Sequence, residues 1–294
     1  FRALRIVKPN KIFFTSSDFW PSFLFAANQL NISTVLTSAR YRKSYNIFLK
    51  MFNKIFCVSD DDYHQIKMNI SNDEIYKIGN PRYDRILNNL ENVEYKLDSS
   101  RQDEGNILIF ASMWDEDNKI IFEKFINSPL VNHFKKVIIV PHEVNDSYLN
   151  YYCSVLEDND FSFKKINQYQ NFNQFEEKYI IVNKVGFLSK LYAQSTITYV
   201  GGGFSKSGIH NIIEPAAASN PVIFGSNFLN SNKSDAEGLI DVSGGFSVDS
   251  YELFTEKINW LLDKNNYNNS SKNCKSFVTE NSGSTEKILK ELYE

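Results

Sequence analysis

The residues best suited to chemistry lie in the segment 201–225, which reads GGGFSKSGIHNIIEPAAASNPVIFG. Gly201, Gly202 and Gly203 follow an apolar run, and glycines at such a position let backbone N–H groups approach a ligand without interference from a Cβ atom. A helix is expected shortly after them. A helix N-terminus that points into a glycine-lined cleft favours an anion, above all a phosphate.

His210, Asn211 and Glu214 add three kinds of polar group to the same segment. His210 and Asn211 can donate to a phosphate or a carboxylate, whereas Glu214 is better suited to accept hydrogen bonds from sugar hydroxyls. The helix is expected to begin near Asn211 or Ile212, which leaves Pro215 in the first turn, where proline is tolerated. The pattern is typical of a nucleotide-sugar site. A tight turn, followed by a glutamate that complements the helix dipole, accounts for the same residues without a ligand.

The elements that must position these residues alternate between short apolar runs and longer amphipathic segments. This alternation predicts parallel sheets with helices on both faces, the α/β class. Ligands of such sheets lie at the carboxyl ends of the strands, and each motif of this chain follows a predicted strand. A helix is predicted from the apolar spacing of SYELFTEKINWLLDK near the end of the chain. The predicted strands are 11–16, 33–38, 54–59, 75–79, 106–112, 136–141, 161–166, 179–183, 197–202 and 221–225.

Two α/β units follow one another along the chain. We assign residues 1–95 to a first domain, 96–105 to a polar linker and 106–294 to a second domain. Four of the predicted strands fall in the first domain and six in the second. Because the chain opens at Phe1 with FRALRIV, which resembles the last turns of a helix, we expect the front strands of the first domain to be missing.

Composition argues against several classes of protein. The 294 residues are 42% hydrophobic and carry a net charge of -3, which favours a globular protein and argues against general nucleic-acid binding. No apolar run approaches the roughly 18 residues that cross a bilayer. The three cysteines are scattered and indicate reduced core thiols, and the four histidines lack metal-ligand spacing, so no metal is expected. The glycine spacing fits neither a Walker loop nor a dinucleotide fingerprint, so neither ATP nor NAD is indicated.

The segment 201–225 resembles the donor motif of the Kdo transferases, which attach 3-deoxy-D-manno-octulosonate (Kdo) to lipid A precursors. The residues that match this motif are Gly201, Gly202, Gly208, His210, Asn211, Glu214, Pro221 and Gly225. Six further segments match the family in order, namely SDFWPSFL (17–24), TSARYRKS (37–44), IGNPRYDRI (78–86), FASMWDED (110–117), VIIVPHEVN (137–145) and VNKVGFLSKLY (182–192). Their Pro-His-Glu and Arg-Tyr-Asp forms are most similar to the Bacteroidetes-type members.

The resemblance implies a GT-B architecture, in which two Rossmann-like domains face each other across a cleft, with the first domain lacking its N-terminal part. It implies an inverting glycosyltransferase that moves Kdo from CMP-Kdo to a lipid A precursor in lipopolysaccharide core biosynthesis. The donor substrate is then CMP-Kdo, no cofactor or nucleic acid is needed, and the enzyme works peripherally at the cytoplasmic face of the bacterial inner membrane. The family's catalytic glutamate lies in a loop that matches no segment of this sequence, and we expect it upstream of Phe1.

The resemblance also assigns binding roles to individual residues. The donor-binding residues are Pro141, His142, Gly186, Gly201, Gly202, Gly203, His210, Asn211 and Glu214. The acceptor-binding residues are Asp18, where the family usually has glutamate, Arg40, and Arg82, where lysine is commoner. The blend of Arg and Lys with Tyr and Phe in 39–54 suits an anionic lipid surface, although an ordinary amphipathic helix would show it as well.

Simpler interpretations stay open for several of these residues. Asp18 fits a helix cap, Arg40 a solvated face, and His142 a satisfied histidine at the end of a strand. Trp114 and Tyr192 are expected to pack rather than to bind a ligand.

Two functional alternatives also stay open. One is another GT-B enzyme with a different nucleotide-sugar donor, such as an epimerase or a different glycosyltransferase. The other is a non-catalytic nucleotide-binding module, because the expected base is absent from this sequence.

Overall fold

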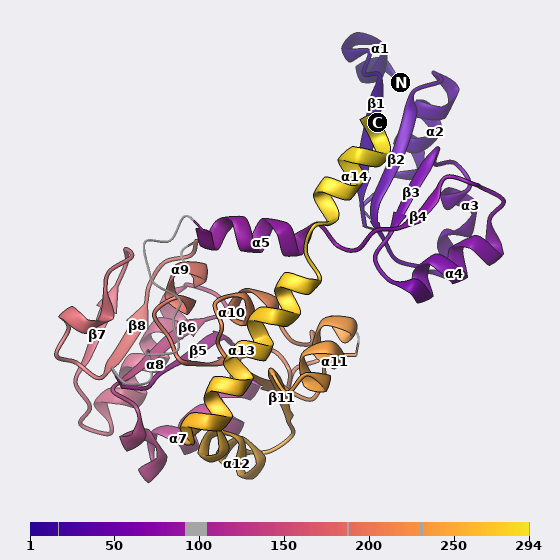
Figure 1. Ribbon diagram of the computed structural model, residues 1–294. Coiled ribbons are helices and arrows are strands. Elements are labelled where there is room, and N and C mark those ends of the chain that lie inside the picture. Colours follow the sequence, from indigo (N-terminus) through magenta and orange to yellow (C-terminus); the bar gives the residue numbers. More distant parts are fainter. Residues whose placement is uncertain (17, 92–104, 187, 230–231, 294) are drawn as a thin grey trace. The chain divides into compact units, whose positions relative to one another are not determined.

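The computed structural model describes residues 1–16, 18–91, 105–186, 188–229 and 232–293 (Figure 1). It consists of two compact units. The first comprises Phe1–Arg85 together with Asn281–Glu294, and the second comprises Ile86–Glu280. Of the predicted linker 96–105, only Gly105 falls within the described residues.

The first unit is built on a four-stranded parallel sheet with the strand order β1-β2-β3-β4. The four strands are β1 (Lys11–Thr15), β2 (Ser33–Ala39), β3 (Lys54–Cys57) and β4 (Ile75–Lys77), and each confirms a predicted strand. The helices of this unit are α1 (Arg2–Val7), α2 (Pro21–Gln29), α3 (Asn46–Leu49), α4 (Asp60–Asn69), the start of α5 (Arg82–Glu91), and α14 (Ser284–Tyr293). A short 3-10 turn over Lys43–Tyr45 precedes α3.

Aromatic side chains form the centre of the first unit's core. Phe14 from β1 and Phe19 from the following loop both pack edge-on against Phe52, at ring-centroid distances of 5.4 and 5.5 Å. Tyr45 and Phe48 lie against the same cluster and are partly buried. The inward packing expected of the aromatic side chains in 39–54 is therefore confirmed for these two residues, although they lie in a 3-10 turn and a four-residue helix rather than in one amphipathic helix.

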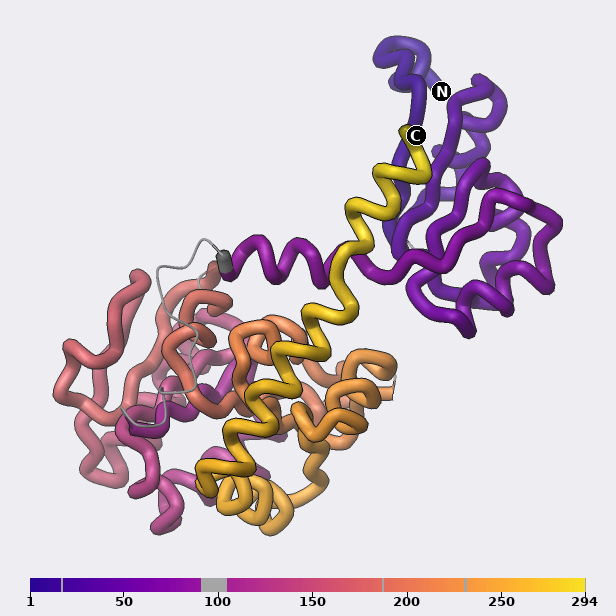
Figure 2. The backbone as a smooth tube through the Cα atoms, in the orientation of Figure 1, coloured from indigo at the N-terminus to yellow at the C-terminus, as the bar shows by residue number. Residues whose placement is uncertain are grey.

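The last helix of the chain belongs to the first unit, although the sequence-based division placed all of 106–294 in the second. Ile288 of α14 packs against Val35 of β2 and Phe56 of β3. The carboxylate of Asp84 accepts hydrogen bonds from the backbone N–H groups of Gly283 and Thr285, on either side of Ser284, the first residue of α14. Figure 2 shows the chain returning to the indigo strands in this way. The division differs because local patterns cannot tell which sheet a distant amphipathic helix will cover.

The second unit contains a seven-stranded parallel sheet with the order β11-β10-β9-β5-β6-β8-β7. Its strands are β5 (Ile107–Met113), β6 (Lys136–Pro141), β7 (Phe163–Ile166), β8 (Tyr179–Val182), β9 (Ile197–Val200), β10 (Val222–Gly225) and β11 (Gly245–Val248). The first six confirm predicted strands, whereas β11 was missed. Its sequence GFSV has only two apolar residues, and it becomes a strand by pairing with β10 from Val222↔Gly245 to Gly225↔Val248.

Helices surround this sheet. They are α6 (Asp115–Asp117), a π-helical turn (Asn118–Phe122), α7 (Glu123–Ile126), α8 (Asp146–Glu157), α9 (Leu188–Tyr192), α10 (Ile213–Ala217), α11 (Lys233–Asp241), α12 (Tyr251–Leu262) and α13 (Lys264–Glu280). Short 3-10 turns cover Pro129–His133 and Phe172–Gln174. Asn145 caps α8 and Ser250 caps α12 by accepting a hydrogen bond from a backbone N–H three residues later. The predicted helix over SYELFTEKINWLLDK is confirmed as α12.

The central strand β5 is the point at which the order of the second sheet reverses. The chain moves outward from β5 through β6 to the β7–β8 edge, then crosses to β9 on the other side of β5. Loops that leave two such neighbouring strands in opposite directions open a crevice at their carboxyl ends. The segments after β5, β6 and β9 therefore define where a ligand of this unit is expected.

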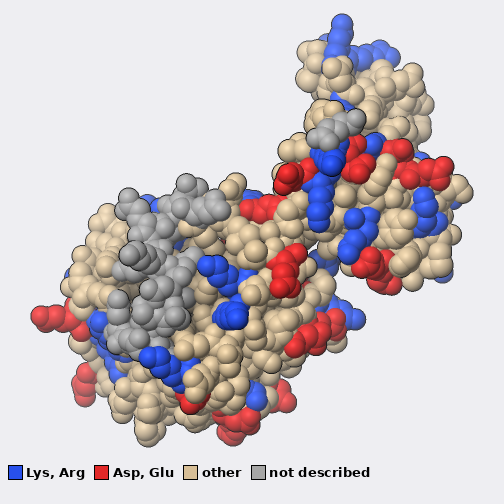
Figure 3. Space-filling view, viewed as in Figure 1, with Lys and Arg blue, Asp and Glu red and all other residues tan. Residues whose placement is uncertain are grey.

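The surface carries both signs of charge. On the face drawn in Figure 3, basic and acidic side chains are interspersed, in keeping with 32 Lys and Arg against 35 Asp and Glu. Within the described ranges, no helix combines the length and the apolar character that a bilayer span requires.

Candidate functional site

Three aromatic side chains stack at the carboxyl edge of the second unit's sheet. Trp114 follows β5, His142 follows β6, and His210 lies in the loop after β9. The rings of Trp114 and His142 are 4.1 Å apart and inclined by 18°, and those of His142 and His210 are 4.5 Å apart. The indole Nε1–H of Trp114 donates to Nε2 of His210 at 2.7 Å. Trp114 therefore packs, as predicted, and its one polar atom also binds a predicted site residue.

Both histidines of this stack favour the neutral form. Burial lowers the pKa of His142, against a smaller opposing effect of Glu143. Burial also lowers the pKa of His210, and the neighbouring His142 lowers it further. Two imidazoles in contact cannot both carry a charge without repulsion, so the pair offers N–H and ring-face contacts rather than a cation.

A buried carboxylate joins the loops that hold this stack. Oδ2 of Asp117 accepts hydrogen bonds from the backbone N–H groups of Gly202, at 2.7 Å, and Trp114, at 3.1 Å. Its Oδ1 accepts from the hydroxyl of Tyr199 at 2.6 Å. Burial raises the pKa of Asp117, and the three hydrogen bonds counteract that rise. One side chain thus connects the turn after β5 to the glycine loop after β9, across the switch point of the sheet.

Sequence analysis did not single out Asp117. It stands among three consecutive acidic residues, Asp115 to Asp117, which read as an ordinary solvated helix start. Its position three residues after Trp114 could have identified it. At this spacing in a helix start, an acidic side chain accepts a hydrogen bond from the backbone N–H of the N-cap residue.

The three glycines allow close packing of the loop rather than open access to its backbone. A Cβ atom on Gly201 would collide with the carbonyl oxygen of Ser112, and one on Gly203 would collide with Gly225. Gly202 has φ +93°, a left-handed conformation that favours glycine. The N–H of Gly201 donates to Ala111, and that of Gly202 donates to Asp117. The expectation that backbone amides of this loop face a ligand is therefore wrong for Gly201 and Gly202, whose N–H groups are bonded within the protein.

Asn211 and Glu214 form a local pair at the start of α10. Oδ1 of Asn211 accepts from the backbone N–H of Ile213 at 3.1 Å, and its Nδ2 donates to Oε1 of Glu214 at 2.7 Å. This geometry confirms the predicted helix start and leaves Pro215 in the first turn. In the part of the chain that the structure describes, the Glu214 side chain makes no other hydrogen bond, so its second carboxylate oxygen is available.

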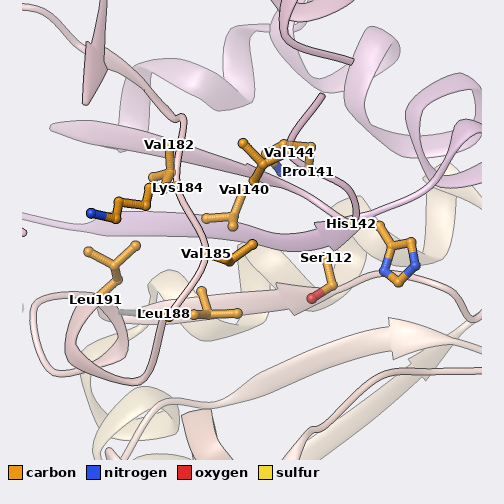
Figure 4. Close-up of a pocket in the computed structure, with 11 residues that line it drawn as sticks. Ser112, Val140, Pro141, His142, Val144, Val182, Lys184, Val185, Leu188 and Leu191 are labelled. Atoms are coloured by element: carbon orange, nitrogen blue, oxygen red, sulfur yellow. The ribbon is translucent and has the colours of Figure 1, made fainter. Parts of the chain in front are cut away.

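A pocket lies beside His142 and brings three predicted donor residues together (Figure 4). Its cavity volume is about 190 Å³, which is smaller than the roughly 300–1,000 Å³ of common ligand pockets. Its lining is largely apolar and consists of Ser112, Val140, Pro141, His142, Val144, Val182, Lys184, Val185, Gly186, Leu188 and Leu191. Gly186 has φ +100°, and a Cβ atom placed there would meet open space, so its conformation rather than crowding explains the glycine.

The predicted acceptor residues lie at the carboxyl edge of the first unit's sheet. Arg40 follows β2, and Arg82 begins α5 just after the turn that leaves β4. Asn80 connects the two segments, because its Oδ1 lies 3.4 Å from Ser38 Oγ and accepts the Arg82 backbone N–H at 3.1 Å. Among the described residues, the Arg40 guanidinium has neither an ion pair nor a hydrogen bond. The acceptor role of both arginines stays a prediction.

Asp18 is exposed and follows β1 in a turn in which its N–H donates to Thr15. The cap of α2 is Trp20, without a side-chain hydrogen bond, and Pro21 is the first helical residue. The interpretation of Asp18 as a helix cap is therefore wrong, while its acceptor role stays a prediction. Tyr192 and the three free cysteines are buried, so their predicted packing roles are confirmed.

Comparison with known proteins shows similarity to one family and identifies the fold. Residues 1–85 match the family model described as 3-deoxy-D-manno-octulosonic-acid transferase (kdotransferase). A 3-deoxy-D-manno-octulosonic acid transferase of Rickettsia bellii is 27% identical over 307 residues, which cover 97% of this chain and 69% of that protein. A bifunctional glycosyltransferase/methyltransferase of Fusobacterium nucleatum is 25% identical over 95% of this chain, which spans 44% of that protein.

A solved structure shows the same fold along the whole chain. The UDP-GlcNAc 2-epimerase of Neisseria meningitidis, bound to UDP-GlcNAc, has a TM-score of 0.67 at 13% identity, covering 99% of this chain and 78% of that one. At this identity the likeness concerns the fold alone. The two Rossmann-like parallel-sheet units are thus of the GT-B type, as predicted.

Proposed function

We propose that this chain, which is a relative of the Kdo transferases, carries the donor-binding and acceptor-binding residues of a glycosyltransferase that moves Kdo from CMP-Kdo to a lipid A precursor with inversion at the anomeric carbon. The observation that carries the proposal is the pocket beside the Trp114–His142–His210 stack. The pocket is lined from β5, β6 and β8, and it lies next to the β5–β9 switch point, where open α/β sheets bind nucleotides.

The donor roles follow from the chemistry of the pocket and its rim. The apolar lining, with Pro141 and the backbone at Gly186, suits the cytosine ring and excludes water from its faces. The available oxygen of Glu214 suits a ribose hydroxyl. His210 suits the phosphate as a neutral N–H donor, so this contact does not depend on a positive charge.

The acceptor roles rest on the charge at the edge of the first unit. Arg40 and Arg82 follow strands of one parallel sheet, and a guanidinium recognises phosphate through two N–H groups at once. A lipid A precursor presents such anionic groups on a membrane surface.

Membrane contact is favoured by apolar side chains that the first unit exposes next to basic ones. Trp20, before α2, is 72% exposed and Ile47, on α3, is 75% exposed. The Asn28 side chain of α2 donates to the carbonyl of Met51, just after α3, so the two helices are neighbours. Lys43 and Lys50 are exposed near Ile47 in sequence. Exposed aromatic and basic groups suit the headgroup region of an anionic bilayer.

The proposal is tested by titrating the protein with CMP, UDP and GDP in a calorimeter. CMP is expected to bind most tightly, and His142→Ala is expected to weaken it at least tenfold, because the ring forms one wall of the pocket. His133→Ala, at an exposed position outside the stack, is the matched control. Equal affinities for the three nucleotides would favour another nucleotide-sugar enzyme instead. CMP binding without Kdo transfer to a lipid A precursor would favour a non-catalytic module.

A further inference from the structure

The hydrogen bond between Trp114 and His210 determines which nitrogen of His210 carries the proton. An indole N–H can only donate, so the Nε2 atom that it meets at 2.7 Å must act as an acceptor. A neutral imidazole has one N–H, and here that proton must be on Nδ1. If the ring were rotated by half a turn, the indole would face a C–H edge and the hydrogen bond would be lost.

The surroundings of His210 keep its ring in this orientation. Cδ2 lies against Gly202, so closely that a Cβ atom on that glycine would be 3.2 Å from it. Nε2 and Cδ2 are therefore both occupied by protein, whereas Nδ1 is on the opposite edge of the ring. Within the described ranges, Nδ1 makes no hydrogen bond.

Asp117 in turn holds both neighbours of the ring. The same Oδ2 atom accepts the backbone N–H of Trp114 and that of Gly202, so the residue that donates to Nε2 and the residue that contacts Cδ2 are fixed by one buried oxygen. Tyr199 fixes the other oxygen. Asp117 does not contact His210 itself, and its effect passes through these two segments.

We propose that Asp117 and Trp114 are positioning residues that hold His210 in its Nδ1–H tautomer, so that it presents a neutral hydrogen-bond donor to an anionic group of a nucleotide bound in the adjacent pocket. The tautomer follows from the geometry of the protein alone. Only the identity of the group that accepts the hydrogen bond from Nδ1–H rests on the proposed function. The lowered pKa of His210 fits this role, since a protonated ring would lose the acceptor that Trp114 requires.

The tautomer is tested by NMR on the full chain labelled with ¹⁵N at histidine, without ligand. In the wild type, the two ring nitrogens of His210 should show the shifts of a protonated Nδ1 and an unprotonated Nε2, and His210→Gln assigns the signals. Trp114→Phe keeps an aromatic ring over His142 but removes the indole N–H, so the Nδ1–H signature should be lost. Trp260→Phe, at the exposed tryptophan of α12, should leave it unchanged. A wild-type His210 protonated on Nε2, or a Trp114→Phe spectrum identical to the wild type, would overturn the proposal.

The role of Asp117 is tested by two variants in the same experiment. Asp117→Asn retains an oxygen that can accept both backbone N–H groups, so it should keep the tautomer. Asp117→Ser is too short to reach both amides, so it should lose the tautomer while circular dichroism reports whether the fold persists. If the serine variant unfolds, the asparagine variant decides. Retention of the tautomer in Asp117→Asn supports the positioning role of Asp117, and loss of the tautomer in Asp117→Asn contradicts that role.

Calorimetric titration with CMP tests whether a nucleotide accepts the hydrogen bond from Nδ1–H of His210. Trp114→Phe should weaken CMP binding about three- to tenfold, the effect expected for one neutral hydrogen bond. Loss of the tautomer with unchanged CMP affinity would overturn the link between this tautomer and nucleotide binding. If the wild type shows the Nδ1–H tautomer but does not bind CMP, the proposed function fails while the positioning roles of Trp114 and Asp117 stand.

Discussion

At the carboxyl edge of each sheet, one interior strand ends in the same backbone conformation, but the residues that follow the two strands differ. Each has a serine in the left-handed conformation where an interior strand ends, Ser38 in β2 with φ 53° and Ser112 in β5 with φ 56°. Both lie where the register shifts between neighbouring strands. A serine rarely adopts this conformation, and such strained positions concentrate at functional edges, where they turn the following residues out of the sheet.

The residues that follow these serines differ in how they are held. After Ser112, Trp114 is bonded to His210 and anchored by the buried Asp117. After Ser38, the partly exposed Arg40 has no bonded partner in the regions that the structure describes. The contrast indicates a preorganised site with two neutral histidines in the second unit and an adaptable, cationic edge in the first. A small donor with one shape suits the former arrangement, and a large anionic acceptor suits the latter.

The largest effect is expected from removing the anchor of the second unit. Asp117→Ala leaves two backbone N–H groups and the Tyr199 hydroxyl without their acceptor in a buried place, which should lower the free energy of unfolding by about 3 kcal/mol or more. Denaturant unfolding measures this change. The control is Glu116→Ala at the exposed neighbouring position, where almost no change is expected. Similar losses in both variants would mean that the edge of the second unit is not held by this carboxylate.

A smaller effect on stability but a clear effect on binding is expected at Glu214. Glu214→Gln keeps an oxygen for Asn211 but removes the charge, which should weaken CMP binding about ten- to a hundredfold and leave the melting temperature nearly unchanged. Calorimetric titration and a melting curve separate the two effects, with the exposed Glu157→Gln of α8 as the control. A lower melting temperature at constant CMP affinity would mean that Glu214 serves only the helix start.

The first unit should respond to a different ligand. Arg40→Ala should weaken binding to vesicles containing a phosphorylated lipid A precursor about fivefold, because one charge-assisted contact is lost, while CMP affinity stays constant. Vesicle co-sedimentation at fixed ionic strength measures the change. Arg42→Ala is the matched control, since its guanidinium lies over the ring of Tyr45. Equal losses of vesicle affinity in the two variants would mean that the edge of the first unit attracts the lipid only as a general basic surface.

The smallest effect concerns pH. Burial lowers the pKa of His142 and His210 below the ordinary value of 6.5, so at lower pH the unfolded chain binds more protons than the folded one. The free energy of unfolding should therefore decrease as the pH falls through 6.5 toward the lowered pKa values. The double variant His142→Gln/His210→Gln should show a shallower decrease than the exposed pair His64→Gln/His133→Gln. Identical pH profiles for the two double variants would contradict a neutral, buried histidine pair.

The sequence by itself determined the α/β class, ten of the eleven strands in the described residues, and three of the residues that line the pocket, namely Pro141, His142 and Gly186. Runs such as KVIIVP and ITYV are apolar throughout because both of their faces are buried, so a local pattern suffices to recognise them. The positions after those strands were equally predictable, because parallel strands bring their carboxyl ends to one edge.

Only the tertiary structure decided what depends on partners far apart in the chain. The strand β11 exists through its pairing with β10, and α14 joins the first unit because Asp84 and Phe56 meet it there. Asp117 becomes an anchor because Gly202 comes within 2.7 Å of it from 85 residues away. Distances between residues that are remote in sequence are set by the packing of the whole sheet, so no local pattern of residue types can contain them.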